Sequence, residues 1–119
     1  MQKAFEWAER EEEFDKRAGF VLMAALAVHD KKAAGIEIAE FLPVIEKHSD
    51  DERNFVKKAV NWALRQIGKR DMALNEQAVE IGRRIMARNT KAARWIAADA
   101  LCELTSRQVR ERLQKRASK

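Results

Sequence analysis

A repeat of about 40 residues is the feature that most limits the folds open to this chain. The segment 14–26, FDKRAGFVLMAAL, aligns with 55–67, FVKKAVNWALRQI, at an offset of 41 residues. The segment 93–104, ARWIAADALCEL, aligns with 55–67 at an offset of 37, and IAEFLPVIEKH matches AVEIGRRIMAR at an offset of 40. Two helices per repeat of this length are typical of HEAT-type solenoids. Chance similarity between amphipathic helices is the alternative, and three copies in register make it the weaker one.

Helical periodicity runs through almost the whole chain, and no stretch alternates as a strand would. Pro43 falls inside the third predicted helix, so we expect that helix to be kinked or to begin later. A Ser or Asp of SDDER should cap the fourth helix, and Thr105 or Ser106 the last. We predict one all-α domain over 1–119, a HEAT-like solenoid of about three repeats. Its predicted helices are 2–9, 13–28, 36–48, 52–69, 75–88, 91–104 and 106–117.

The charge is distributed unevenly along the chain. Residues 1–53 carry 8 Lys and Arg against 13 Asp and Glu, a net charge of −5. Residues 54–119 carry 16 against 6, a net charge of +10, which accounts for the overall +5. A basic half on a folded domain is expected of a protein that binds a polyanion. A solvated, lysine-rich helical surface is the alternative, and charge alone does not choose between them.

Composition and motifs exclude several classes of protein. A single cysteine cannot form an intrachain disulfide, and the charged N-terminus and short apolar runs predict neither a signal peptide nor a membrane span. We therefore expect a cytoplasmic protein. No glycine-rich phosphate loop is present, and the histidines have no partners at metal-ligand spacing. We expect no cofactor and no metal.

The segment 55–70, FVKKAVNWALRQIGKR, carries the candidate binding residues. As a helix it places an apolar arc within about half of its circumference, and we predict that this arc lies in the core. The arc consists of Phe55, Val56, Ala59, Val60, Ala63, Leu64 and Ile67. Trp62 lies on the other side, in line with Lys58, Arg65 and Lys69 at spacings of four, three and four residues. Arg17 aligns with Lys58 at the 41-residue offset, which places it on the same surface.

These five residues allow two interpretations. The second helices of stacked pairs line a concave face, where the cations would contact phosphates and Trp62 would offer its ring to a base, a sugar or a cationic lesion. Alternatively, Trp62 packs against a neighbouring repeat and the cations are merely solvated. The position of Trp62 among cations, away from the apolar arc, favours the binding interpretation.

At DERNFVKKAVNWALRQIGKRD and ARWIAADALCELTS, the chain resembles the bacterial DNA alkylation repair enzymes built of HEAT-like repeats. These are glycosylases that release N3- and N7-alkylated purines. The resemblance covers essentially the whole chain, from WAEREEEFDKRAGF onward, and is most specific at 55–70. It implies that Trp62 and Arg65, which match the motif K-A-x-x-W-A-L-R, line the cleft that holds the duplex and its damaged nucleotide. Arg17, at the second basic residue of the family's R-R-x-A motif, would contact the backbone of the double-stranded DNA.

One part of the family pattern is not found. The family's catalytic carboxylate lies in a Trp-Asp-x-x-Asp segment one repeat upstream of the helix that matches 13–28, and this sequence has no such segment. We therefore expect a chain truncated to the C-terminal half of the family domain. A glycosylase needs a carboxylate near the anomeric carbon. Asp99, which aligns with Trp62 in the last repeat, is a weak candidate to replace it, and a salt bridge is its more common role. Whether the chain is an enzyme stays open, and a HEAT-repeat scaffold for protein partners is the alternative function.

Overall fold

The computed structural model describes residues 1–117, and each of its regular elements is an α-helix. The helices are α1 (Gln2–Ala8), α2 (Glu13–His29), α3 (Gly35–Ala39), α4 (Phe41–Lys47), α5 (Asn54–Gly68), α6 (Met72–Ala87), α7 (Lys91–Leu104) and α8 (Arg107–Ala117). No strand occurs between residues 1 and 117, so the predicted all-α class is confirmed.

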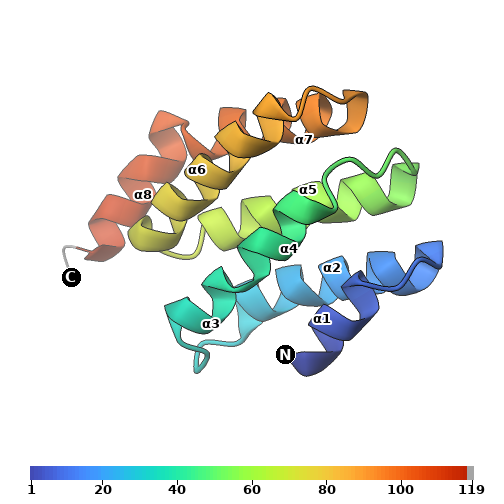
Figure 1. Cartoon of the computed structure of the whole chain (residues 1–119). Coiled ribbons are helices and arrows are strands. Elements are labelled where there is room, and N and C mark those ends of the chain that lie inside the picture. The colour runs from blue at the N-terminus through green and yellow to red at the C-terminus, as the bar shows by residue number, and fades with distance from the viewer. Residues whose placement is uncertain (118–119) are drawn as a thin grey trace.

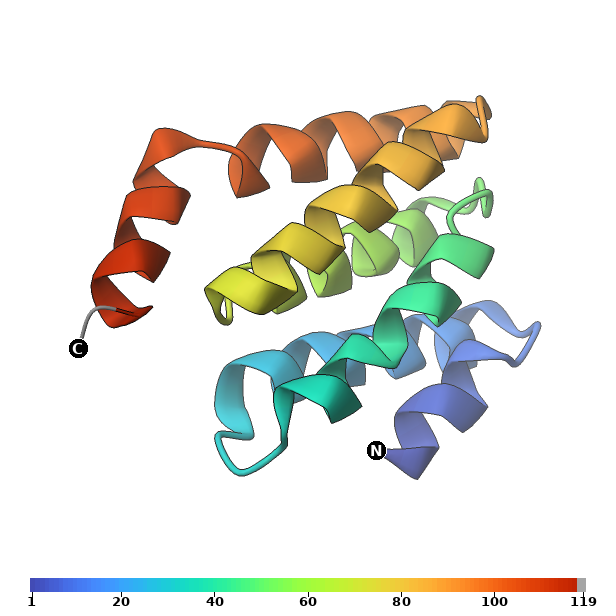
Figure 2. The ribbon, with the colours of Figure 1, turned by 60° about the vertical axis from the view of Figure 1, so that its left-hand side comes forward.

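The helices form two layers (Figures 1 and 2). α2, α5 and α7 pack side by side in one layer, and α1, α4 and α6 lie across them in the other. Each helix of the first layer runs antiparallel to the helix that precedes it, and α8 crosses the end of the stack beside α6 and α7. The arrangement is compatible with a helical-repeat solenoid. The placement of α2 and α5 on one surface agrees with the 41-residue register of the sequence.

The core lies between the two layers and follows the apolar periodicity of the sequence. Every predicted core position of α5 except Phe55 is at most 4% exposed. Large side chains from both layers fill the interior, among them Phe20, Met23, Phe41, Ile45, Leu64, Ile67, Leu74, Ile85, Ile96 and Leu104. Burial of such side chains supplies the main favourable free energy of folding.

Pro43 divides the third predicted helix. α3 ends at Ala39 and α4 begins at Phe41, so the expected kink is a break at Glu40. Pro43 occupies the third position of α4, where its missing N–H has no partner within the helix in any case. Its ring would clash with the carbonyl of Ala39, four residues earlier, if the helix continued through both segments.

The start of α5 differs from the prediction. The sequence predicts a helix from residue 52 with a Ser or Asp cap, but α5 begins at Asn54, and Arg53 at its N-cap makes no side-chain cap hydrogen bond. The Asp51 carboxylate instead accepts hydrogen bonds from Lys16 Nζ and Arg53 Nη2, both at 2.8 Å. The residue predicted as a cap thus forms a salt bridge that joins the loop before α5 to α2. At the end of the chain, Ser106 caps α8 as predicted, its Oγ accepting from the Val109 N–H at 3.3 Å.

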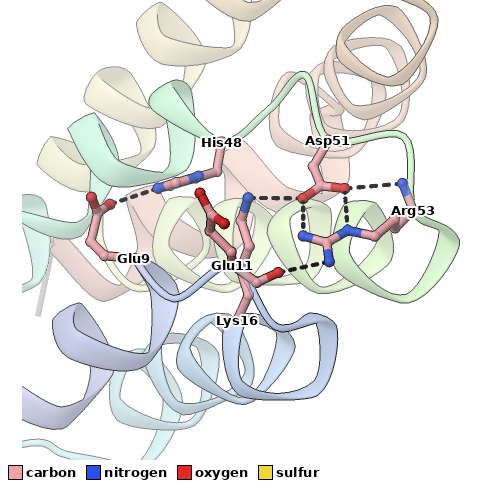
Figure 3. A network of polar contacts seen from close by, with 6 residues as sticks. All are labelled: Glu9, Glu11, Lys16, His48, Asp51 and Arg53. Carbon is pink, nitrogen blue, oxygen red and sulfur yellow. Dashed lines mark hydrogen bonds and ion pairs between the residues drawn. The ribbon is translucent and has the colours of Figure 1, made fainter.

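The salt bridge between Lys16 and Asp51 belongs to a polar network that holds the loop 48–53 against α1 and α2 (Figure 3). Lys16 is only 8% exposed, and Asp51 is the partner of its ammonium. The Arg53 guanidinium first, and then Lys16, hold the pKa of the Asp51 carboxyl well below its usual range. Beside them, the His48 Nε2 and Glu9 Oε1 atoms lie 2.6 Å apart. Burial lowers the pKa of His48 despite this carboxylate. The network sets how the first helix pair meets the second.

Candidate nucleic-acid interface

The outer surface of the α2, α5 and α7 layer carries the candidate residues. Helical spacing places Phe14 and Arg17 on one side of α2, and Trp95, Asp99 and Glu103 on one side of α7. The corresponding stripe of α5 contains Phe55, Lys58, Trp62, Arg65 and Lys69. We call these three stripes together the aromatic–cationic face. The structure therefore brings all five predicted binding residues and Asp99 to one surface.

Exposed aromatic rings are the first property of this face. Trp62 is 41% exposed, as its position away from the apolar arc predicts. The prediction of a buried Phe55 is wrong, because its side chain is 51% exposed. Phe55 lies at the edge of the apolar arc, seven residues before Trp62 and so on nearly the same side of α5, and the Arg17 guanidinium carbon lies 5.7 Å from its ring centroid. Phe14 and Trp95 are exposed as well.

The cations of the α5 stripe fall into two groups. Within residues 1–117, the Lys58 side chain has no hydrogen bond or ion pair and is exposed to solvent. Arg65 and Lys69 are instead paired with α7, since Arg65 Nη1 and Lys69 Nζ each lie 3.3 Å from a Glu103 carboxylate oxygen. Two of the predicted cations are thus partly neutralised, and Lys58 is fully available to an anion.

Asp99 is held in place by α5. Its Oδ2 accepts a hydrogen bond from Asn61 Nδ2 at 2.7 Å and lies 3.6 Å from Arg65 Nε. The salt bridge expected as its alternative role is therefore present. Half of the side chain stays exposed on the aromatic–cationic face, so the carboxylate is accessible to a bound molecule.

Sequence reasoning missed several members of this surface. Glu103 and Asn61 carried no motif, and their roles follow from the pairing of α5 with α7. Trp95 is a further member, because it is 41% exposed and the Lys57 ammonium lies 5.5 Å from its ring centroid. The match of Phe14 to Phe55 at the 41-residue offset was a usable signal, because equivalent positions of stacked repeats lie on the same side of the stack.

The other layer offers a different kind of surface. A hollow of about 540 Å³ lies between α4 and α6 and is lined by apolar side chains together with Glu76, Gln77, Glu80 and Arg84. With two carboxylates against one cation, it does not suit a polyanion. Among residues 1–117, no cluster of three or more His, Cys, Asp or Glu could hold a metal ion. None of the described helices has both the length and the apolar content that a membrane span needs.

Comparison with known proteins gives one finding. A family model described as DNA alkylation repair enzyme matches residues 1–113. No curated protein and no solved structure shows significant similarity to the chain.

Proposed function

Because this chain belongs to the DNA alkylation repair enzyme family, we propose that it binds double-stranded DNA through the aromatic–cationic face and has a role in the repair of alkylated bases. The helix pairs would be HEAT-like repeats, and the protein would act in the cytoplasm. The observation that carries this proposal is the alternation of exposed rings with cations along neighbouring helices: Phe14 and Arg17 on α2, and Phe55, Lys58 and Trp62 on α5.

The two kinds of side chain would act on different parts of the DNA. Cations on a stripe neutralise backbone phosphates without reading sequence, which suits an enzyme that must scan any duplex. An exposed ring can stack on a base or face a sugar, and its π-face attracts a cationic alkylated purine. Trp62 lies between Lys58 and Arg65 on one stripe, so a nucleotide against its ring would have phosphate contacts on either side.

The face also limits the chemistry that we expect. Loss of a purine builds positive charge on the sugar, which a nearby carboxylate stabilises. Asp99 is the candidate, but Arg65 and Asn61 already hold it, so part of its charge is compensated. We therefore propose that the chain binds alkylated DNA and releases N7-methylguanine slowly. N7-alkylated purines are cationic before they leave, so their release needs less help than that of a neutral base.

A scaffold for a protein partner is the second candidate function. Exposed Phe14, Phe55, Trp62 and Trp95 are the observation that favours it, because large exposed rings are enriched at protein interfaces. The two functions differ in their dependence on salt, since phosphate contacts release counterions and apolar contacts do not.

Fluorescence anisotropy with a labelled duplex at several salt concentrations tests DNA binding. We expect affinity to fall steeply with salt and to fall further in Lys58→Ala and Arg17→Ala, equally for all sequences. Trp62→Ala should cost about 1–3 kcal/mol if a base or sugar stacks on the ring. Arg83→Ala is the matched control, because Arg83 is an exposed cation of α6 in the other layer. Affinity that ignores salt, or equal losses in the control, would favour the scaffold.

Base release from methylated duplex under single-turnover conditions tests the chemistry. We expect slow release of N7-methylguanine by the wild type and slower release by Asp99→Asn, which keeps the size of the side chain and removes its charge. Rapid release by both proteins would show that another group stabilises the sugar cation. Equal, slow release by both would exclude Asp99 and leave binding as the main activity.

A further inference from the structure

A basic pocket lies at the opposite end of the first layer from Phe14 and Phe55. It has a volume of about 670 Å³ and is lined by residues at and after the C-terminal ends of α2 and α5 and by residues of α8. Its cations come from three segments of the chain, the loop after α2, the end of α5 and α8: Lys31, Lys69, Arg70, Arg112 and Arg116. Among residues 1–117, Asp71 is the one carboxylate in its lining. A volume within about 300–1,000 Å³ is typical of pockets that bind small ligands or parts of larger ones.

The cations greatly outnumber the anions in this pocket. In the described part of the chain, five basic side chains and one carboxylate line the hollow, a net charge of +4. Asp71 is also engaged elsewhere, because its Oδ1 caps α6 by accepting from the Leu74 N–H at 2.8 Å. Like charges gathered in a hollow repel one another and raise the free energy of the folded state. An anion bound among them would offset that cost.

Structural roles explain only part of the cluster. Arg70 donates from Nη1 to the Ala27 carbonyl at the C-terminal end of α2, at 2.9 Å, and from Nη2 to the Ala33 carbonyl in the loop that follows, at 2.7 Å. Lys69 pairs with Glu103 on the aromatic–cationic face. Arg116 donates to the Arg70 carbonyl at 3.4 Å, which is a long and exposed contact.

Lys31 and Arg112 have no such role. In the part of the chain that the structure describes, neither side chain makes a hydrogen bond or an ion pair. They come from the loop after α2 and from α8, which are distant in sequence, so only the fold brings them to one pocket. Lys31 and Arg112 are therefore free to bind an anion, and the Arg70 guanidinium is already held in the same pocket. Such a group of cations suits an anion with more than one negative charge.

We propose that this pocket binds phosphate groups, with Lys31 and Arg112 as the principal contacts. Arg offers paired donors in a plane that match a phosphate, and Lys adds a mobile point charge. Two sources of phosphate fit the pocket. The first source is DNA. Lys69 belongs both to the pocket and to the α5 stripe, so a DNA backbone that follows the aromatic–cationic face past Lys69 would enter the pocket. A free diphosphate can also enter. The DNA source rests on the proposed function, whereas the affinity for phosphate does not.

The test compares Lys31→Ala/Arg112→Ala with Lys32→Ala/Arg83→Ala in two titrations. The control removes the same two charges from side chains that do not line the pocket. Calorimetry with inorganic pyrophosphate measures the pocket directly, and we expect binding about tenfold weaker in the first variant than in the control. Anisotropy with duplex DNA measures the second source. If the backbone enters the pocket, the slope of log affinity against log salt falls by about 1 to 2 in the first variant only.

The outcomes separate this inference from the proposed function. Loss of pyrophosphate binding in Lys31→Ala/Arg112→Ala alone supports a phosphate site in the pocket, whether or not duplex affinity changes. A reduced salt slope in that variant alone also supports it and identifies the DNA backbone as the source. If both variants match the wild type in both titrations, the inference is overturned while DNA binding stands. A wild type that binds pyrophosphate but no duplex would overturn the proposed function and leave a site for free phosphates.

Discussion

Asp51 shows how a single side chain can decide the way two helix pairs meet. Its carboxylate accepts from Lys16 and Arg53, and its side chain is 10% exposed, like that of Lys16. Removal of one partner from a buried pair leaves the other charge uncompensated. We therefore expect Asp51→Asn to lower the free energy of unfolding at neutral pH by about 3 kcal/mol, measured by urea denaturation. Asp15→Asn is the control, because its pair with Arg10 is half exposed and should contribute less than about 1 kcal/mol.

The same carboxylate predicts how stability depends on pH. The folded state lowers the pKa of Asp51 from 3.8, so its contribution is fully present above that value and is lost as the pH falls through the lower folded pKa. Burial lowers the pKa of His48 from 6.5, so protonation of His48 removes stability earlier, as the pH falls below 6.5. We expect unfolding free energy to decline gently below pH 6.5 and steeply below pH 3.8. In Asp51→Asn the fall in unfolding free energy below pH 3.8 should be smaller than in the wild type. An equal fall in both proteins would contradict the contribution of the Asp51–Lys16 pair to stability.

At the scale of the helix, Gly19 sets the distance between α1 and α2. A Cβ added there would lie 2.8 Å from the Ala8 Cα and 2.9 Å from the Ala4 carbonyl oxygen, which are backbone atoms that cannot turn aside. We expect Gly19→Ala to destabilise the protein by about 3 kcal/mol and to detach α1. Thermal unfolding and hydrogen exchange of the α1 amides measure the two effects.

Gly35 provides the matched control for this prediction. An added Cβ there meets only the Asp71 Oδ2 at 3.9 Å, and the residue begins α3 without a positive φ. Gly35→Ala should leave stability unchanged or raise it by about 0.5 kcal/mol, because alanine reduces the freedom of the unfolded chain. Equal destabilisation by the two substitutions would show that the contact between α1 and α2 does not limit stability.

At the scale of the whole molecule, the carboxylates of α7 moderate the charge of the aromatic–cationic face. Asp99 and Glu103 pair with Arg65 and Lys69, so part of the cationic stripe is neutralised in the unbound protein. The double substitution Asp99→Asn/Glu103→Gln would leave these cations unpaired. If the face contacts phosphates, the duplex affinity should rise severalfold, measured by anisotropy at low salt.

The control for this prediction makes the same change of charge on the other layer. Glu76→Gln/Glu80→Gln alters the lining of the hollow between α4 and α6. Salt screens charges over about 10 Å at 0.1 M, so this variant should change the affinity much less. Equal gains in both variants would mean that net charge alone attracts the DNA. A loss of affinity in Asp99→Asn/Glu103→Gln would contradict a phosphate-binding face.

The sequence by itself determined the helices, their register and the side of α5 that carries the cations. Local periodicity suffices for these features, because each depends on neighbours three or four residues apart. It also indicated that the third predicted helix is interrupted near Pro43, since a proline acts on its own helix, and the break lies at Glu40. The stripe of Lys58, Trp62 and Arg65 was predictable for the same reason.

Only the tertiary structure decided which partners these side chains have. Arg65 and Glu103 are 38 residues apart, Lys16 and Asp51 are 35 apart, and the basic pocket joins residues from Lys31 to Arg116. The helical period relates only near neighbours, and the 40-residue repeat aligns equivalent positions without showing which side chains meet. Phe55 was misplaced for a related reason: it lies at the edge of the apolar arc, seven residues before Trp62, and periodicity does not say how far around α5 the neighbouring helices cover that arc. Pairing and burial depend on how far neighbouring helices extend, and packing alone sets that.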